Sequence, residues 1–281
     1  MPESGWTALS ESEDEQAPRG VDPTTANVAR MWDYYLGGKD NYAVDRETAE
    51  KVLARYPELR SVARENRAFL IRAVAYLAGE AGIRQFIDVG SGLPTQRNVH
   101  QVAQEVARDA RVVYVDYDRV VTTHARALLR GVPGMTAVVD ADLRDPESIL
   151  EHPDTRDLID FNEPVAVLLS AILHFVPDEG DPYGLVAQLM KPLAPGSYLA
   201  LTHAGSKEIT PRAHEAAGEY RSATAQITLR TQSDVARFFT GLELVEPGVV
   251  PITEWHNPTP PSDTVAEDLE GAGYVGVGCK R

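Results

Sequence analysis

Short apolar runs alternate with amphipathic segments along the middle of the chain, and this alternation constrains the fold more than any other feature. We predict strands at the apolar runs 86–89, 112–115, 136–139, 165–169 and 198–201. Between several of them apolar residues recur at helical spacing, in the segments 99–106, 120–129 and 182–193. Strands that are separated by helices run parallel, and the helices cover both faces of the sheet. The sequence therefore predicts an α/β fold with a doubly wound, mostly parallel sheet.

The last third of the chain departs from this rhythm. Residues 205–240 predict a helical insertion, in which a loosely amphipathic helix over 205–230 precedes a short helix capped by Thr231 and Asp234. Two strand-like runs follow without a large helix between them, so we expect a terminal antiparallel pair. These runs are residues 249–253 and 274–279.

The chain divides into three segments. Residues 1–20 are rich in Glu, Ser, Asp and Pro and lack apolar periodicity, so we expect a disordered acidic tail. Residues 21–57 predict two short helices on either side of a glycine pair. Residues 58–281 form the predicted main domain, which begins with a long helix that ends near Gly79.

The segment 21–57 concentrates aromatic residues around its two glycines. Aromatic side chains, a flexible turn and polar groups are typical of a loop that closes over a ligand, so we interpret the segment as a helical lid. The alternative is a helical hairpin that permanently covers the edge of the sheet. The residues assigned to the lid are Tyr34, Tyr35, Gly37, Gly38, Lys39, Asp40 and Asn41.

The charge balance argues against polyanionic partners. With 27 basic and 42 acidic residues the formal charge is −15, which disfavours nucleic acid and anionic membranes. The single cysteine, Cys279, excludes an internal disulfide framework, and no cluster of His, Cys, Asp and Glu has metal-ligand spacing. No apolar run approaches the roughly 18 residues of a membrane span. We expect a cytoplasmic protein without a metal.

The sharpest local motif is Asp88-Val89-Gly90-Ser91-Gly92, between one predicted strand and the following helix. Glycine lets the backbone turn tightly and approach a ligand, and the helix N-terminus offers free N–H groups. In an open α/β sheet ligands bind outside the carboxyl ends of the strands. The motif therefore predicts a nucleotide-type site.

Two later strands also end in carboxylates. Asp116 ends the second strand, where it can accept both hydroxyls of a ribose, and Tyr117 beside it offers a flat face to adenine. Asp142 follows the third strand, where it can accept from the exocyclic amine of adenine. Strand ends are also ordinary places for aspartate in solvated loops, but the three motifs together favour a site.

A dinucleotide-binding fold is the main competitor. Its fingerprint is G-x-G-x-x-G/A, and here Thr95 occupies the third position after Gly90 and Gly92. This departure disfavours NAD without excluding it.

The order of these motifs resembles that of class I S-adenosylmethionine (SAM) methyltransferases. More specifically, the chain is similar to an actinobacterial S-adenosyl methyltransferase family that was long a domain of unknown function. The likeness runs from about residue 23 to 280. It is carried by the motifs ARMWDYYLGGKDNYAVDR, ARENRAFL, QFIDVGSGLPT, VVYVDYD, LLSAILHFVPD, PGSYLALTHA and FFTGLELVEPGVV.

The resemblance implies a seven-stranded sheet with a terminal antiparallel pair, and SAM as the cofactor. It also implies that Gly90, Gly92 and nearby backbone hold the methionine part of SAM. Asp116 would hold the ribose, and Asp142 with Leu143 would meet the adenine. The acceptor of the methyl group is not implied.

Candidate residues for the reaction follow the fourth and fifth strands. The segment from Ser170 to Phe175 is expected near the methyl group, with His174 as the candidate base and His203 as a second one. The alternative for His174 is a histidine packed on the end of the sheet and hydrogen-bonded to a backbone carbonyl. Asn66 and Arg67 are candidates for the methionine carboxylate, although such charges usually form a solvated helix face.

We expect a methyltransferase that acts on a small-molecule acceptor, because dense aromatics and an extra helical segment suit an enclosed pocket. Two alternatives stay open. One is a SAM-binding regulator that does not catalyse, since no base is unambiguous. The other is an NAD-dependent oxidoreductase.

Overall fold

The computed structural model describes residues 22–94, 97–128, 134–206, 226–259, 269 and 271–281. The predicted acidic tail at 1–20 lies outside these residues. Most of the amphipathic helix predicted at 205–230 also lies outside them, and its described end, 226–229, is not helical.

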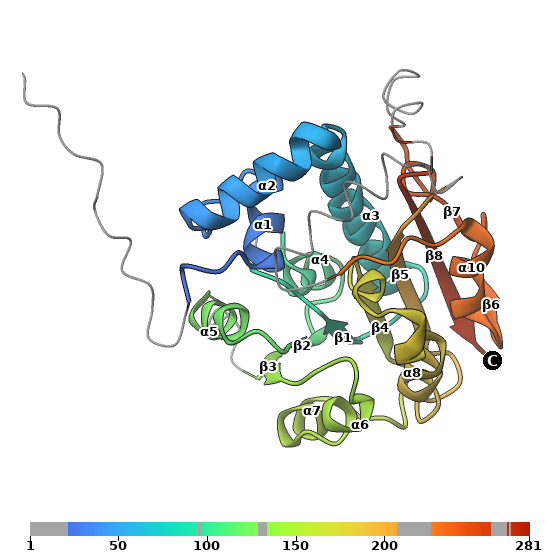
Figure 1. The fold of residues 1–281 in the computed structure, drawn as a ribbon. Helices are drawn as coiled ribbons and strands as arrows, with labels where there is room; N and C mark the ends of the chain where they lie inside the picture. Colours follow the sequence, from blue (N-terminus) through green and yellow to red (C-terminus); the bar gives the residue numbers. More distant parts are fainter. Residues whose placement is uncertain (1–21, 95–96, 129–133, 207–225, 260–268, 270) are drawn as a thin grey trace, which may run out of the picture.

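Seven strands form one continuous sheet in the order β3-β2-β1-β4-β5-β8-β6, and the short β7 pairs with β8 (Figure 1). The first five strands are parallel, whereas β8 runs antiparallel to β5, β6 and β7. The strands are β1 (Gln85–Val89), β2 (Arg111–Asp116), β3 (Thr136–Asp140), β4 (Ala166–Ser170), β5 (Tyr198–Ala204), β6 (Leu242–Leu244), β7 (Val250–Pro251) and β8 (Gly273–Lys280).

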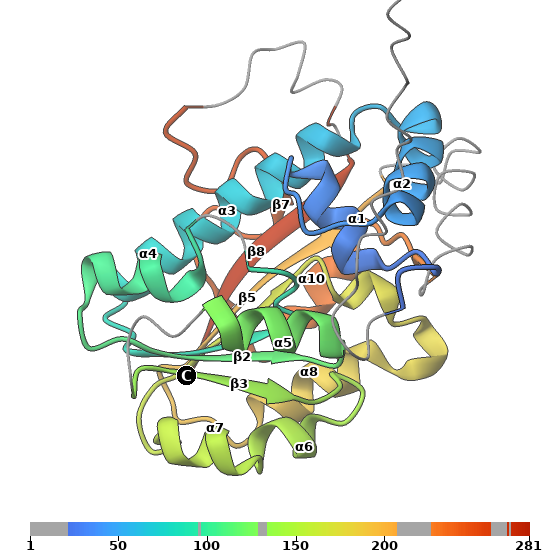
Figure 2. The same cartoon turned by 90° about the vertical axis from the view of Figure 1, so that its left-hand side faces the viewer.

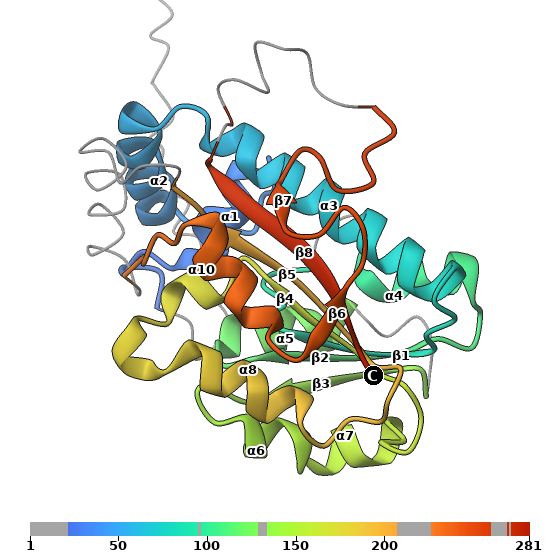
Figure 3. The same ribbon diagram turned by 90° about the vertical axis from the view of Figure 1, so that its right-hand side faces the viewer.

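Helices cover both faces of the sheet. Figures 2 and 3 show α3 (Leu59–Gly79), α4 (Val99–Val106) and α5 (Arg119–Leu128) on one face. The opposite face carries α6 (Pro146–Leu150), α7 (Pro153–Leu158), α8 (Pro182–Met190) and α10 (Gln232–Ala236). The described 3-10 helices are η1 (Leu173–Phe175), η2 (Asp178–Gly180) and η4 (Arg237–Phe239).

Each face of the sheet has its own hydrophobic core. Ile87 and Val89 of β1 pack in the core under α8, while Phe86, the residue before Ile87, packs in the core under α3. Because both faces are buried, the strands are continuous apolar runs without polar alternation. The predicted doubly wound, mostly parallel sheet with a terminal antiparallel pair is confirmed.

Three short elements were not predicted. Helices α6 and α7 lie between β3 and β4, and each has proline at its first turn, with Asp145 accepting from Ser148 N at the start of α6. The third is β6, whose three residues pair with the end of β8. Such short elements carry too few residues to show a periodic pattern.

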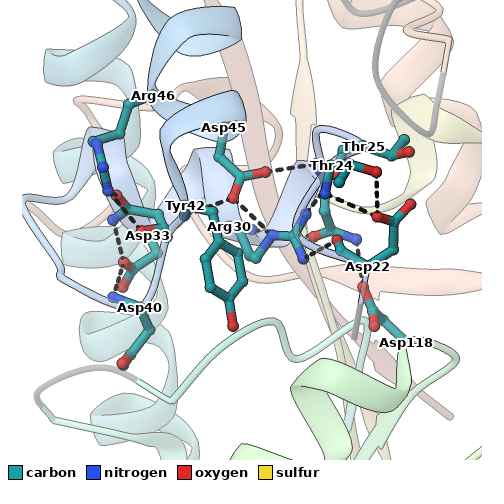
Figure 4. A network of polar contacts seen from close by, with 12 residues as sticks. Asp22, Thr24, Thr25, Arg30, Asp33, Asp40, Tyr42, Asp45, Arg46 and Asp118 are labelled. Atoms are coloured by element: carbon teal, nitrogen blue, oxygen red, sulfur yellow. Dashed lines mark hydrogen bonds and ion pairs between the residues drawn. The ribbon is translucent and has the colours of Figure 1, made fainter. Parts of the chain in front are cut away.

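Helices α1 (Val28–Tyr35) and α2 (Ala43–Arg55) form a hairpin above the carboxyl end of the sheet (Figures 1 and 2). A buried ion pair joins them, with Arg30 Nε 2.7 Å from Asp45 Oδ2. Figure 4 shows the Arg30 guanidinium also donating to the backbone oxygens of Asp22 and Thr25, at 3.1 and 2.6 Å. The hairpin is therefore held by buried polar contacts.

A further bond joins this hairpin to the sheet. Asn27, the N-cap of α1, donates through Nδ2 to Asp118 Oδ2 in the loop after β2 (Figure 4). Among the residues that the structure describes, no helix combines the length and the apolar character that crossing a membrane requires.

Candidate functional site

A cavity opens at the carboxyl ends of β1, β2 and β4, underneath α1. It encloses about 1020 Å³, including the open solvent at its mouth. The chain continues from β1 to β2 on one side, whereas β4 lies on the other side of β1, so this is the switch point where open α/β sheets bind ligands. The cavity is lined by Asp88, Gly90, Ser91, Gly92, Asp116, Tyr117, Asn66, Arg67 and Ser170, among others.

The glycine turn after β1 forms the floor of the cavity. Gly90 and Gly92 have φ of +70° and +66°, a backbone region that suits glycine. A Cβ on Gly90 would lie 2.6 Å from Cγ1 of Ile172, so this glycine is required by protein packing. A Cβ on Gly92 would have nothing within 4 Å among the described residues. Gly92 is therefore the position where a ligand can come close to the backbone.

Asp116 joins the end of β2 to the glycine turn. Its Oδ2 accepts from Gly92 N at 3.0 Å and its Oδ1 from Asp118 N at 2.9 Å. Burial raises the pKa of this carboxyl to about 6, although these backbone N–H groups favour the ionised form. Each carboxylate oxygen has a second lone pair, so both can also accept from a ribose diol.

Asp88 and Arg67 provide opposite charges deeper in the cavity. Burial raises the pKa of Asp88 to about 7, against the opposing charge of Arg67. Arg67 comes from α3 and donates through Nη2 to the backbone oxygen of Arg97 at 2.9 Å. Desolvation lowers the pKa of Arg67, so both side chains share a poorly solvated region.

Asn66 ties α3 to the ends of β4 and β5. Its Nδ2 donates to Ser170 Oγ at 3.1 Å, and Thr202 Oγ1 donates to Asn66 Oδ1 at 2.5 Å. Thr202 in turn accepts from the N–H of Ala171, which has the left-handed φ of +55°. Asn66 is thus buried and belongs to the site, not to a solvated helix face. Ala171 lies in the segment that was expected near the methyl group, whereas Thr202 was missed, because nothing in its local sequence distinguishes it.

The predicted adenine residues line an adjoining cavity that shares Gly90, Asp116 and Tyr117 with the first. Asp142 and Leu143 both line it. Asp142 forms a bidentate contact with Arg144, with Nε–Oδ1 at 2.9 Å and Nη2–Oδ2 at 2.5 Å. Tyr117 also lines both cavities and is 53% exposed.

The predicted lid residues do not line these cavities. Tyr35 is buried in the core of the hairpin, and the hydroxyl of Tyr34 donates to Glu50 Oε1 of α2. Gly37, Gly38, Lys39, Asp40 and Asn41 form the turn after α1 and are not lining residues either. The residues of α1 and its flanks that line the first cavity are Asn27, Val28, Ala29, Trp32, Asp33 and Leu36.

Helical geometry explains this correction. Ala29, Trp32, Asp33 and Leu36 recur at spacings of three and four, so they share one face of α1. The sequence does not show which face of this helix meets the sheet, so the lid was assigned to aromatic and turn residues.

The candidate bases are also placed elsewhere. His174 of η1 and His203 of β5 are buried, with ring centroids 5.7 Å apart, and neither lines the described cavities. Burial lowers the pKa of His174 well below its usual value and that of His203 to about 4. His174 Nδ1 accepts from Ala204 N at 3.4 Å, and Arg230 Nη1 lies 2.7 Å from His203 Nε2. Both histidines are therefore packed groups, and the ring of His174 bonds a backbone N–H where the alternative expected a backbone carbonyl.

Among the described residues, no group of three or more His, Cys, Asp or Glu side chains is placed to hold a metal ion.

The sequence matches the family described as S-adenosyl methyltransferase over residues 14–281. A protein from Thermobifida fusca YX, named as a candidate methyltransferase, is 44% identical, with a TM-score of 0.89 over 95% of this chain and 99% of its own. A DUF574 family protein from Streptomyces avermitilis MA-4680 is 45% identical, with a TM-score of 0.84 over 92% and 98%. Mitomycin 7-O-methyltransferase MmcR, 14% identical with a TM-score of 0.50 over 93% and 74%, shares the fold alone. No curated protein matches the sequence.

Proposed function

The chain belongs to the S-adenosyl methyltransferase family, and we propose that its cavity binds SAM and that the protein transfers the methyl group to a small-molecule acceptor. The observation that carries this proposal is Asp116, a buried carboxylate bonded to the amide of Gly92 at the mouth of the glycine turn. A carboxylate so placed suits a ribose, and the open backbone at Gly92 suits the chain of the methionine.

The lining residues fit the parts of SAM. The amino and carboxylate groups of its methionine call for opposite charges, which Asp88 and Arg67 supply. The adjoining cavity offers Leu143 as an apolar surface and Asp142 as an acceptor for the adenine. The family resemblance also implies Asp142 and Leu143, whereas Asp88 and Arg67 are assigned from the lining of the cavity.

Bound SAM supplies a methyl group on a sulfonium, which is already reactive towards a nucleophile. The protein then has to position the two reactants and exclude water. Helix α1 roofs the cavity for this purpose, and the bond between Asn27 and Asp118 holds the roof to the sheet. No histidine or lysine lines the described cavities, which favours a reaction driven by positioning.

Two experiments test the proposal. Calorimetric titration with SAM and with NAD identifies the cofactor, and tight binding of NAD alone would refute it. Incubation with methyl-labelled SAM and a metabolite extract tests the acceptor class, and label found only in macromolecules would refute a small-molecule acceptor. Binding of SAM without any transfer would instead favour a non-catalytic SAM-binding regulator, which the absence of histidines from the described cavities also suits.

A further inference from the structure

The cavity extends beyond the residues assigned to SAM, under the lower face of α1. Trp32, Asp33 and Leu36 line this part from above, and Phe175 of η1 lines it from the side of β4. None of the four is assigned to a part of SAM, and Phe175 also lines the adjoining cavity. This region, which we call the roof pocket, is therefore available to the methyl acceptor.

The residues that line the whole cavity are mostly acidic among those that carry a charge. Among the described residues its lining contains Asp33, Asp88, Asp116 and Asp118, and Arg67 is the basic residue. Asp116 bonds the glycine turn, Asp118 accepts from Asn27, and Asp88 faces the charge of Arg67. Asp33 is the acidic group that these assignments leave unused.

Asp33 is a buried carboxylate with one oxygen engaged. It is 4% exposed, and its Oδ2 accepts from Asp40 N and from Asn41 Nδ2, both at 2.9 Å (Figure 4). Both of these bonds end on Oδ2, whereas Oδ1 packs against Gly38 and accepts no hydrogen bond from the residues that the structure describes. Burial raises the pKa of Asp33, because the ionised carboxylate is poorly solvated there. A cation bound in the pocket would offset this effect and stabilise the ionised form.

The turn after α1 is built around this carboxylate. A Cβ on Gly38 would lie 1.9 Å from Asp33 Oδ1 and 2.3 Å from its Cγ. Gly38 does not have a positive φ, so the close carboxylate is the physical reason for glycine here. The turn thus fixes the position of Asp33, although burial of its carboxylate disfavours the ionised form.

Aromatic side chains line the same cavity as this carboxylate. Trp32 precedes Asp33 on α1 and lines the same cavity, and Phe175 lines it from η1. Aromatic faces attract cations through their quadrupole, most strongly where water is excluded. A buried carboxylate beside aromatic rings is a combination that recognises an ammonium group and rejects an anion.

We propose that the methyl acceptor carries a protonated amine, which Asp33 binds in the roof pocket beside Trp32 and Phe175. This inference rests on the proposed function, because it assigns the acceptor side of the same cavity. In this proposal the ammonium group anchors the acceptor. It need not be the group that receives the methyl group.

Binding of matched probes tests the proposal. The protein is first titrated with S-adenosylhomocysteine, which occupies the cofactor site without turnover. The loaded protein is then titrated with phenethylamine, phenethyl alcohol and phenylacetate, which share a phenyl ring and differ in charge. We expect the amine to bind at least about tenfold more tightly than the alcohol, and phenylacetate to bind most weakly.

Two variants separate recognition from structure. Asp33→Asn should reduce the affinity for phenethylamine to that for the alcohol, and should leave the affinity for S-adenosylhomocysteine within about twofold. Asn41→Ser removes the hydrogen bond to Oδ2 but keeps the carboxylate, so it should retain the preference for the amine.

Failure to bind S-adenosylhomocysteine would refute the proposed function itself. If that ligand binds, the acceptor inference is overturned by no binding of the amine or by equal binding of amine and alcohol. It is also overturned if Asp33→Asn keeps the preference or if Asn41→Ser loses it. A large loss of S-adenosylhomocysteine affinity in Asp33→Asn would place Asp33 in the cofactor site and overturn it as well.

Discussion

Replacement of Asp116 by alanine separates ligand binding from stability. The carboxylate accepts from Gly92 N and Asp118 N, and the change leaves both amides without this acceptor, at about 1–3 kcal/mol each. The raised pKa of about 6, against an ordinary value of 3.8, means that the ionised carboxylate carries a penalty of about 3 kcal/mol at neutral pH. The variant removes that penalty too, so these opposing effects on the free energy of unfolding are of similar size.

The effect on SAM binding has no such compensation. A hydrogen bond to a charged group contributes about 1.5–3 kcal/mol, so losing the contact to ribose should raise the Kd for SAM roughly 10-fold to 150-fold. Calorimetry measures the Kd, and urea unfolding measures stability. We therefore expect a large loss of affinity with a smaller change in stability.

Asp140 provides the matched control. It is the register partner of Asp116 at the end of β3, lies outside the described cavities and pairs with Arg126 at 3.1 Å. Asp140→Ala should leave the Kd for SAM unchanged. An unchanged Kd in folded Asp116→Ala would refute the ribose assignment, and equal losses in both variants would show that the effect is not specific to Asp116.

Three further predictions concern the roof and the charged floor. Gly38→Ala should lower the free energy of unfolding by about 1–3 kcal/mol, because the new Cβ would lie 1.9 Å from Asp33 Oδ1. In urea unfolding the cost should shrink in an Asp33→Ala background, and equal costs in both backgrounds would contradict the packing argument. Burial raises the pKa of Asp88 from 3.8 unfolded to about 7 folded, so its contribution to stability is fully present below about pH 4 and is lost as the pH rises through 7. Unfolding of the ligand-free protein from pH 5 to 8 should show this decline, and Asp88→Asn should flatten it; the same slope in the variant would assign the decline to another group. Hydrogen exchange over residues 30–45 should be slow before SAM is added and little changed after, because buried bonds dock the hairpin; slowing on addition of SAM would restore the moving lid.

The sequence alone was sufficient where structure is local or periodic. The strands β1 to β5 and their intervening helices α4, α5 and α8 follow apolar spacing, and the final antiparallel pair follows from the lack of a large helix between its runs. The glycine turn and Asp116 were also found, because in a parallel sheet the residues just after each strand meet at one edge. These parts of the cavity could be predicted from the ends of the strands alone.

Only the tertiary structure decided which side chains from distant segments meet. Asn66 bonds Ser170 across 104 residues and Thr202 across 136, so no local pattern predicts the network. The orientation of α1 is set by its buried ion pair and by packing on α3, which turns Trp32 and Asp33 into the cavity and Tyr35 into the core. Successive residues of a helix are about 100° apart around its axis, so the rotation of the helix decides which residues face the cavity, and that rotation depends on contacts far away in the sequence.

The two candidate histidines show the same difference between the position of a residue along the chain and the direction of its side chain. His174 follows β4 and His203 lies near the end of β5, as expected, but the 3-10 turn η1 packs His174 against His203, whose ring in turn contacts Arg230. The sequence determined which residues come near the sheet edge. Packing determined which of them face the cavity, because the direction of a side chain depends on the whole set of contacts around it.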